Sequence, residues 1–169
     1  MLAYRDGDAG AFETLYTRHR GALFRFVLRG ASDRGLAEEL YQDIWMRVIE
    51  ARGRYTPQAK FTTWLYTIAH NRLVDHWRRK GLSVVALEEE DLPGGAPDPA
   101  RILQGRQALE RFAAALEGLP VAQREAFLLH EEAGLSVAEI AAATGTNEEA
   151  AKSRLRYAMA KLKAAVGDG

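Results

Sequence analysis

The stretch that decides the fold is SVAEIAAATGTNEEAAKSRLRYAMAKLKAAV, residues 136–166. It opens with a capping box, in which Ser136 and Glu139 can satisfy each other's helix-terminal N–H groups, before a short apolar helix. A turn around Gly145 leads to a second predicted box over residues 146–149, which begins a longer helix ending near Val166. A short helix, a glycine-containing turn and a longer basic helix are typical of a helix-turn-helix.

The last helix of this stretch has a face that could contact duplex DNA. With Leu155 at the centre of the buried side, helical spacing turns polar and basic side chains outward near the start of the helix. Arginine can read guanine through two hydrogen bonds, and lysine, serine and tyrosine suit phosphate. The candidates for DNA contact are Lys152, Ser153, Arg154, Arg156 and Tyr157. A helical hairpin with merely solvated basic residues is the alternative.

Helical spacing extends through the rest of the chain, and no stretch alternates apolar and polar residues as a half-buried strand would. Residues 81–100 are different, because they contain Gly94-Gly95, three prolines and the acidic run 88–91. The sequence therefore predicts an all-α protein with two small helical domains, over residues 1–80 and 101–169, joined by a flexible acidic linker. Predicted helices begin after Asp8, near Ser32 or Asp33, at about Phe61, near Ile102, and after Leu119-Pro120 with an end at Gly134.

Composition narrows the classes of protein. The 169 residues include no cysteine, so disulfides, thiolate nucleophiles and cysteine-ligated zinc are excluded. No apolar run approaches the ~20 residues that span a bilayer, and no signal-peptide pattern opens the chain, so we expect a cytoplasmic protein without membrane insertion. The charges cancel overall, but residues 1–80 carry a net charge of +5 and residues 81–104 one of −4. Locally basic segments on either side of an acidic one suggest two surfaces that meet phosphate, with scattered surface charge as the alternative.

The predicted helix over residues 36–50 has an exposed polar face. Its members follow the spacing i, i+3, i+4, i+7 and are Glu39, Gln42, Asp43 and Met46. This face could dock a basic partner helix. The alternative is a merely solvated face, and the pattern alone favours that alternative.

Residues 52–80 interleave aromatic and basic side chains. A polar stripe on the helix, which includes Thr63, Thr67, Asn71, Val74 and Arg78, is long enough to follow a nucleic-acid strand. Single-stranded DNA binding requires this combination, because bases stack on aromatic rings while basic groups hold the backbone. A well-packed core filled with aromatic side chains is the alternative.

Catalytic motifs do not occur in the sequence. No G-x-x-x-x-G-K-[ST], H-E-x-x-H or G-x-S-x-G pattern is present, and His70 and His76 do not share a helix face. We expect no enzymatic activity, no metal and no cofactor.

Several ordered segments together resemble the extracytoplasmic-function (ECF) group of sigma-70 family RNA polymerase sigma factors. Residues 37–43, AEELYQD, are similar to a segment of that group, and residues 61–71 with Arg78-Arg79 match its most characteristic stretch. In the second half, Leu119-Pro120, the Ser136 box and residues 152–155, KSRL, resemble the domain that reads the −35 promoter element. The likeness covers about residues 8–80 and 101–166.

The resemblance implies functions for the surfaces described above. The Glu39 face would dock on the β′ clamp helices of core RNA polymerase, and the second domain would meet the β flap and the duplex −35 element. The first domain would capture single-stranded −10 DNA and aid promoter melting, because an extruded base offers its edge and faces to a pocket. The candidate −10 residues are Arg54, Tyr55, Lys60, Phe61, Thr63, Trp64, Thr67, Asn71 and Arg78. A cognate anti-sigma factor is also implied.

Two departures from the family pattern affect these expectations. Asp43 replaces the usual glutamate, and residues 149–151, EAA, replace the common Gly-Thr-Val before Lys-Ser-Arg. Two other functions remain open from the residues. One is a self-standing helix-turn-helix regulator of duplex operators, which would leave the Glu39 face without a role. The other is a helical adaptor or anti-sigma-like interaction module.

Overall fold

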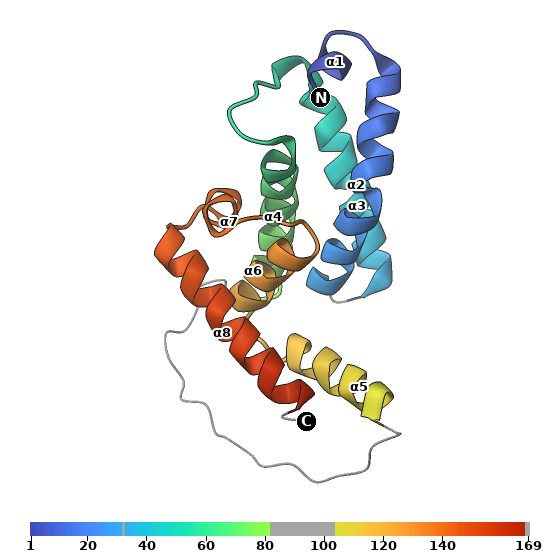
Figure 1. Cartoon of the computed structure of the whole chain (residues 1–169). Coiled ribbons are helices and arrows are strands. Elements are labelled where there is room, and N and C mark those ends of the chain that lie inside the picture. Colours follow the sequence, from blue (N-terminus) through green and yellow to red (C-terminus); the bar gives the residue numbers. More distant parts are fainter. Residues whose placement is uncertain (32, 82–103, 168–169) are drawn as a thin grey trace.

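The computed structural model describes residues 1–31, 33–81 and 104–167, and these are helical throughout apart from short connections (Figure 1). The first half contains α1 (Leu2–Arg5), α2 (Ala9–Gly30), α3 (Arg34–Glu50), the short 3-10 helix η1 (Arg52–Arg54) and α4 (Phe61–Arg79). The second half contains α5 (Gln104–Glu117), α6 (Val121–Glu131), α7 (Val137–Thr144) and α8 (Glu148–Val166). The predicted all-α class is confirmed. Most of the predicted linker, residues 82–100, lies outside the described residues.

The helix starts follow from their capping side chains. Asp8 accepts a hydrogen bond from the Ala11 N–H at the start of α2, and Asp33 accepts one from the Leu36 N–H at the start of α3. Ser136 and Glu139 form the expected reciprocal capping box of α7. Two short elements, α1 and η1, were not predicted, because neither is long enough to show helical periodicity.

The predicted start of the last helix is wrong by one residue. Asn147, not Thr146, is the N-cap of α8, and its side-chain oxygen accepts from the Ala150 N–H at 2.8 Å. Asparagine is a better N-cap than threonine, and the preceding Gly145 closes α7 in the left-handed region with φ +66°. The turn therefore uses both Gly145 and Thr146 before the helix begins.

The first half is held together by α2, α3 and α4. Phe26 packs edge-on against Tyr66 of α4, with ring centroids 5.2 Å apart, and both side chains are fully buried. The end of α2 approaches α4 closely, since the Trp77 indole donates to the Gly30 carbonyl and a Cβ at Gly30 would lie 2.8 Å from Leu73. Gly30 therefore permits the packing that aligns α4 with the bundle.

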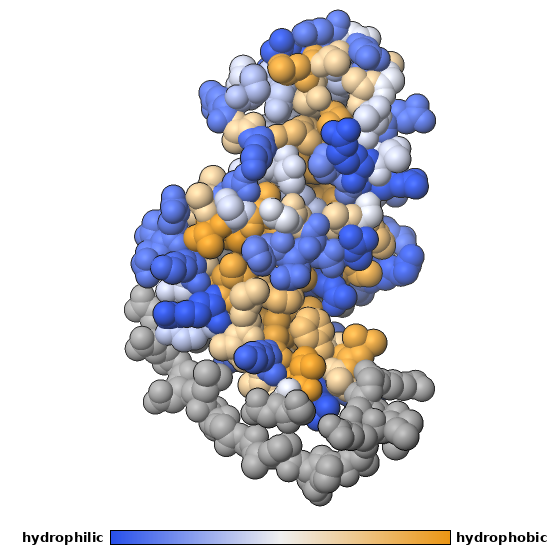
Figure 2. All heavy atoms as spheres, viewed as in Figure 1, coloured by the Kyte–Doolittle hydropathy of each residue, from blue (hydrophilic) through white to orange (hydrophobic). Residues whose placement is uncertain are grey.

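In the second half, α8 packs along α5, α6 and α7, and Leu155 and Leu162 lie in its buried stripe. Apolar side chains gather over this half, around α6 and α8, whereas the half that contains α2–α4 shows mainly hydrophilic residues in the same view (Figure 2). Met159, one turn along α8 from Leu155, is 42% exposed. The three helices that pack on α8 leave this side of it uncovered.

The two halves are in contact with each other. Helix α4 packs against α7, α2 contacts α6, and the buried apolar residues of both halves form one continuous cluster (Figure 1). His70 of α4 and Glu125 of α6 meet in this contact, with 2.6 Å between Nδ1 and Oε1. Sequence reasoning made no prediction about this arrangement.

Candidate protein and nucleic-acid interfaces

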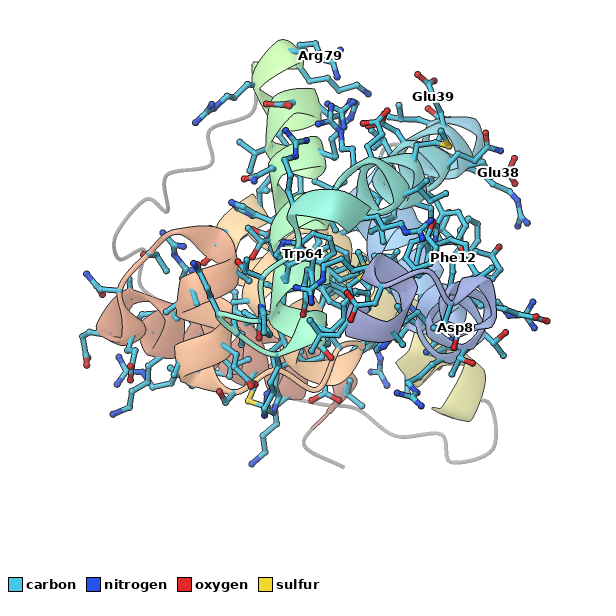
Figure 3. The ribbon with its side chains drawn as sticks, turned by 90° about the horizontal axis from the view of Figure 1, so that it is seen from above. Asp8, Phe12, Glu38, Glu39, Trp64 and Arg79 are labelled. Atoms are coloured by element: carbon cyan, nitrogen blue, oxygen red, sulfur yellow. The ribbon has the colours of Figure 1, made fainter. Side chains whose placement is uncertain are left out.

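The polar face of α3 is largely exposed, as the spacing predicted. Glu39 and Gln42 are exposed, and the Met46 side chain is 53% exposed on the same side of the helix. Figure 3 shows Glu38 and Glu39 projecting outward from α3, away from half-buried Trp64. Ile49, which sequence reasoning missed, is 37% exposed one turn beyond Met46. Its i+3 spacing from Met46 was the available signal.

Asp43 differs from the other members of this face because it is paired within the molecule. Its carboxylate forms ion pairs with Arg72 of α4 and, at 3.2 Å, with Arg47 one turn along α3. Arg72 also reaches Asp75, at 3.3 Å. The expectation that Asp43 lies on a free face opposite the core is therefore wrong. Asp43 ties α3 to α4 at the edge of the docking face.

A cavity of about 400 Å³ lies where the chain between α3 and α4 passes over the start of α4. Five of the candidate −10 residues border it, namely Arg54, Tyr55, Thr63, Trp64 and Thr67. The structure thus brings together side chains that the sequence only placed in one segment. The rest of the wall comes from Ala51, Thr56, Gln58 and Ala59, and one residue of the second half, Ala142, also borders the cavity.

Two candidate −10 residues are more buried than expected. The Tyr55 ring packs edge-on against Trp64, with centroids 4.9 Å apart, and burial raises the pKa of its phenol. Thr63 is 5% exposed. Tyr55 therefore supports the cavity wall rather than presenting an open ring face, since the residue is only 6% exposed. Thr63 is enclosed on the side of the molecule where α7 meets α4.

Asn71 borders a second groove that shares its wall with the cavity. This groove, of about 310 Å³, is lined by residues that include Arg54, Trp64, Asn71 and Arg72. Because Arg54 and Trp64 border both hollows, the two form one continuous surface. The expected uninterrupted polar stripe along α4 is wrong, because Thr63 and Val74 are buried. Exposed Asn71 and Arg78 remain at its outer end.

The remaining candidates in this half have distinct surroundings. Phe61 is half-buried and contacts His19 of α2, with ring centroids 5.2 Å apart. Lys60, whose side chain is 77% exposed, forms a 2.8 Å ion pair with Glu139 at the start of α7. That ammonium and the Ser136 backbone N–H hold the pKa of Glu139 below its ordinary value.

The outward face of α8 centres on Lys152 and Arg156, which are exposed, as is Glu149 one turn before Lys152. Ser153, Arg154 and Tyr157 are half-buried at its flanks, because α8 is packed on three other helices. The Arg156 guanidinium lies 5.1 Å from the centre of the Tyr157 ring, a cation–π contact that orients it. The five candidate residues therefore share one surface, with Lys152 at its centre.

No group of three or more histidine, aspartate or glutamate side chains in the described residues is arranged to hold a metal ion. None of the helices within residues 1–31, 33–81 and 104–167 is long and apolar enough to cross a membrane. The surfaces that stand out in this part of the chain are thus the α3 face, the hollows beside α4 and the α8 face.

Comparison with protein families gives two matches along the chain. Residues 15–82 match the family model described as Sigma-70 region 2. Residues 109–162 match the model described as Sigma-70, region 4. The first match contains the α3 face and the hollows, and the second contains the α8 face.

Similar proteins and structures cover nearly the whole chain. RNA polymerase sigma factor CarQ of Myxococcus xanthus is 34% identical over 99% of this chain and 96% of its own. The ECF sigma factor SigF of Caulobacter vibrioides is 35% identical over 96% and 89%. The structure of CnrH in complex with the cytosolic domain of CnrY is similar with a TM-score of 0.69, at 26% identity over 96% of this chain and 92% of that one. The sigma factor RpoE in complex with the anti-sigma factor NepR, from Bartonella quintana, gives a TM-score of 0.68 at 25% identity, over 90% of this chain and 94% of that one.

Proposed function

The chain belongs to the ECF group of sigma-70 family RNA polymerase sigma factors, and from that premise we propose how its surfaces divide the work of initiation. The protein binds core RNA polymerase and directs promoter-specific transcription initiation. A stand-alone operator-binding regulator does not account for the first half of the chain, which matches region 2. We assign polymerase docking and −10 recognition to residues 1–80 and −35 recognition to residues 101–169.

The α3 face is the docking site for the β′ clamp helices in this proposal. Exposed Glu39 and Gln42 provide acidic and amide groups, and exposed Met46 adds an apolar contact toward the C-terminal end of the helix. Interfaces of this kind combine an apolar centre with a complementary charged rim. Asp43 contributes through its ion pair with Arg72, which fixes α3 relative to α4.

The hollows beside α4 receive the single-stranded −10 element. The supporting observation is the shared wall of Arg54 and Trp64, which places a cation and an aromatic ring next to the exposed amide of Asn71. An amide can bond the edge of an extruded base while a guanidinium holds the phosphate backbone. Lys60 and Arg78 supply further positive charge at the two ends of this surface.

The α8 face reads the duplex −35 element, and the second half contacts the β flap. Exposed Lys152 and Arg156, with Arg154 beside them, give the start of the recognition helix a basic surface. Exposed Glu149 lies one turn before Lys152. We propose that its negative charge lowers the nonspecific affinity for DNA, rather than that it accepts a hydrogen bond from a cytosine amino group. Like the relatives solved with CnrY and NepR, the protein pairs with an anti-sigma factor.

We further propose that the protein acts without catalysis or cofactor of its own and works in the cytoplasm, where core polymerase transcribes. The observation that carries the whole proposal is that a family match to each half coincides with a separate surface suited to its expected ligand.

The proposal is tested by reconstitution with core RNA polymerase. The full chain should be retained by immobilised core enzyme, and the holoenzyme should give discrete run-off transcripts from a subset of a promoter library. Core enzyme alone is the control. Transcripts that are identical with and without the chain would contradict the proposal.

A further inference from the structure

A further cavity, of about 620 Å³, lies where the end of α2 and the start of α3 meet α5 and α6 (Figure 1). None of its lining residues belongs to the α3 face, the hollows beside α4 or the α8 face. Its volume falls in the range of about 300–1,000 Å³ that small-molecule sites occupy. The proposed function leaves this cavity without a role.

Guanidinium groups dominate the wall of this cavity. Four arginines and two carboxylates border it, so the lining carries a net charge of +2, and the charged residues are Arg25, Arg29, Arg34, Arg124, Asp33 and Glu117. Half-buried Leu28 and fully covered Leu116 add apolar surface between them. A hollow with several convergent cations and an apolar wall suits an anion that also has an organic part.

Arg124, in the first turn of α6, is the least compensated of these arginines. Its side chain is half-buried, and burial lowers the pKa of the guanidinium, whereas the charge of Glu117 acts in the opposite direction. Within residues 1–31, 33–81 and 104–167, no ion pair or hydrogen bond engages this guanidinium. A cation that has lost part of its water gains free energy when an anion binds it through charge-assisted hydrogen bonds.

The other three arginines have carboxylate partners that lie outside the cavity lining. Arg25 is 2.6 Å from Glu132, and Arg29 is 3.9 Å from the same residue, so one carboxylate serves two cations. Arg34 is 3.0 Å from Glu38, and both of these side chains are largely exposed. Exposed pairs contribute little to stability. The guanidiniums can therefore turn toward a more highly charged anion.

The two acids of the lining restrict which anion can bind. Asp33 accepts a hydrogen bond from the Leu36 N–H at 2.9 Å, so its carboxylate caps α3. Glu117 is exposed at the end of α5. An extended polyanion such as a nucleic-acid strand would meet both carboxylates, and contact between like charges is costly. A compact anion can instead lie among the guanidiniums alone.

We propose that this cavity binds a small organic phosphate of about the size of a nucleoside diphosphate. Guanidiniums hold phosphate oxygens through paired hydrogen bonds, and a phosphate brings more charge than the carboxylates already present. Arg124 and Arg29 are the main phosphate ligands, because the chain itself compensates them least. Leu28 and Leu116 contact the organic part. The inference concerns the free chain and does not rest on the proposed function.

Calorimetric titration of the full chain tests the proposal. The probes are ADP, pyrophosphate and adenosine, each in magnesium-free buffer. We expect ADP to bind saturably, with one ligand per chain and submillimolar affinity. Pyrophosphate should bind more weakly because it lacks the organic part, and adenosine should not bind because it lacks the charge.

Substitutions in the lining locate the site. Arg124→Gln should weaken ADP binding about tenfold or more, because it removes charge-assisted hydrogen bonds. Arg111→Gln makes the same change of net charge at an exposed position of α5 that does not border the cavity, and is the matched control. Glu117→Gln should tighten binding, with Glu131→Gln as its exposed control. Circular dichroism checks folding, and Arg29→Gln replaces Arg124→Gln if that variant unfolds.

Absence of saturable ADP binding would overturn the inference. Equal weakening by Arg111→Gln and Arg124→Gln would overturn it as well, because binding that follows net charge means an adventitious ion only. ADP that binds no more tightly than pyrophosphate would exclude the organic part of the ligand. Displacement of ADP by an equimolar DNA oligonucleotide would assign the cavity to a nucleic-acid backbone instead. None of these results bears on run-off transcription by the holoenzyme, so failure of the proposed function is recognised separately.

Discussion

At the scale of single residues, neighbouring carboxylates on α3 have different surroundings. Glu39 projects outward, as Figure 3 shows, and Glu38 forms a 3.0 Å pair with Arg34 on the same helix. Asp43 is tied to Arg72 on another helix. The same charge on the same helix can therefore serve docking at one position and packing at another.

Reversal of charge at Glu39 should separate docking from stability. Glu39→Lys should weaken binding to core polymerase by about tenfold or more, because like-charge contact at an interface costs several kcal/mol. The same substitution should leave the melting temperature of the chain unchanged. Asp43→Lys should lower both, because it also breaks the pair with Arg72. Glu38→Lys is the control for net charge. Competition binding to core enzyme and thermal melts measure the two effects, and an unchanged affinity in both Glu39→Lys and Asp43→Lys would remove the docking assignment.

Asn71 should act in strand capture. We expect Asn71→Ala to reduce open-complex formation on duplex promoters more than it reduces binding to core polymerase, because the exposed amide borders the groove next to Trp64. Permanganate footprinting on duplex and pre-melted templates measures this. An equal defect on the pre-melted template would mean that Asn71 does not act in capture.

At the scale of elements, packing leaves fewer polar residues of α8 exposed than the sequence pattern predicted. The pattern placed several polar residues outward, and contacts with α5, α6 and α7 leave Lys152 and Arg156 most exposed. Arg154 lies at a flank, half-buried. The two arginines therefore approach DNA from different positions on the helix.

Substitutions on α8 should separate base reading from phosphate contact. We expect one of Arg154→Ala and Arg156→Ala to cost ~1–3 kcal/mol and to relax preference at one −35 position. The other should weaken all sequences alike and lower the salt slope by about one counterion. Glu149→Gly should raise nonspecific affinity. Selection of −35 sequences at several salt concentrations distinguishes these effects, and an identical consensus and slope in all three variants would exclude α8 as the reading helix.

At the scale of the whole molecule, burial of histidines links packing to pH. Burial lowers the pKa of His19, and the nearby charge of Arg18 lowers it further. Burial also lowers the pKa of His76. The charges of Lys80 and Arg79 act in the same direction, whereas the charge of Asp33 opposes them. The unfolded chain therefore binds more protons than the native one just below pH 6.5. Stability is present above that pH and is lost as the pH falls.

Acidification should therefore lower the melting temperature before any carboxylate titrates. Between pH 7.5 and 5.5 we expect a progressive decrease in the wild type and a flatter profile in His19→Gln with His76→Gln. Below the ordinary pKa of glutamate the decrease should continue, because Glu139 has a lowered pKa and loses its pairing with Lys60 when protonated. Thermal melts across this range test the prediction. A wild-type profile that is flat from pH 7.5 to 5.5 would contradict it.

The sequence by itself determined the local structure and the family. Capping residues such as Asp8 and Ser136 fix helix starts through hydrogen bonds to N–H groups three residues away. Helix starts of this kind can therefore be identified from the sequence alone. Apolar periodicity likewise indicated the buried stripe around Leu155. The ordered motifs of both halves identified the sigma factors, and the comparisons confirm that family.

Only the tertiary structure decided which of the candidate residues are free to act. Asp43 pairs with Arg72, Tyr55 packs against Trp64, and Thr63 borders the same cavity as Ala142, and each partner lies on a different element. The contact between His70 and Glu125 joins residues 55 positions apart in the chain. Periodicity gives the face of one helix but not which other helix covers it, because that choice depends on the summed packing of distant segments.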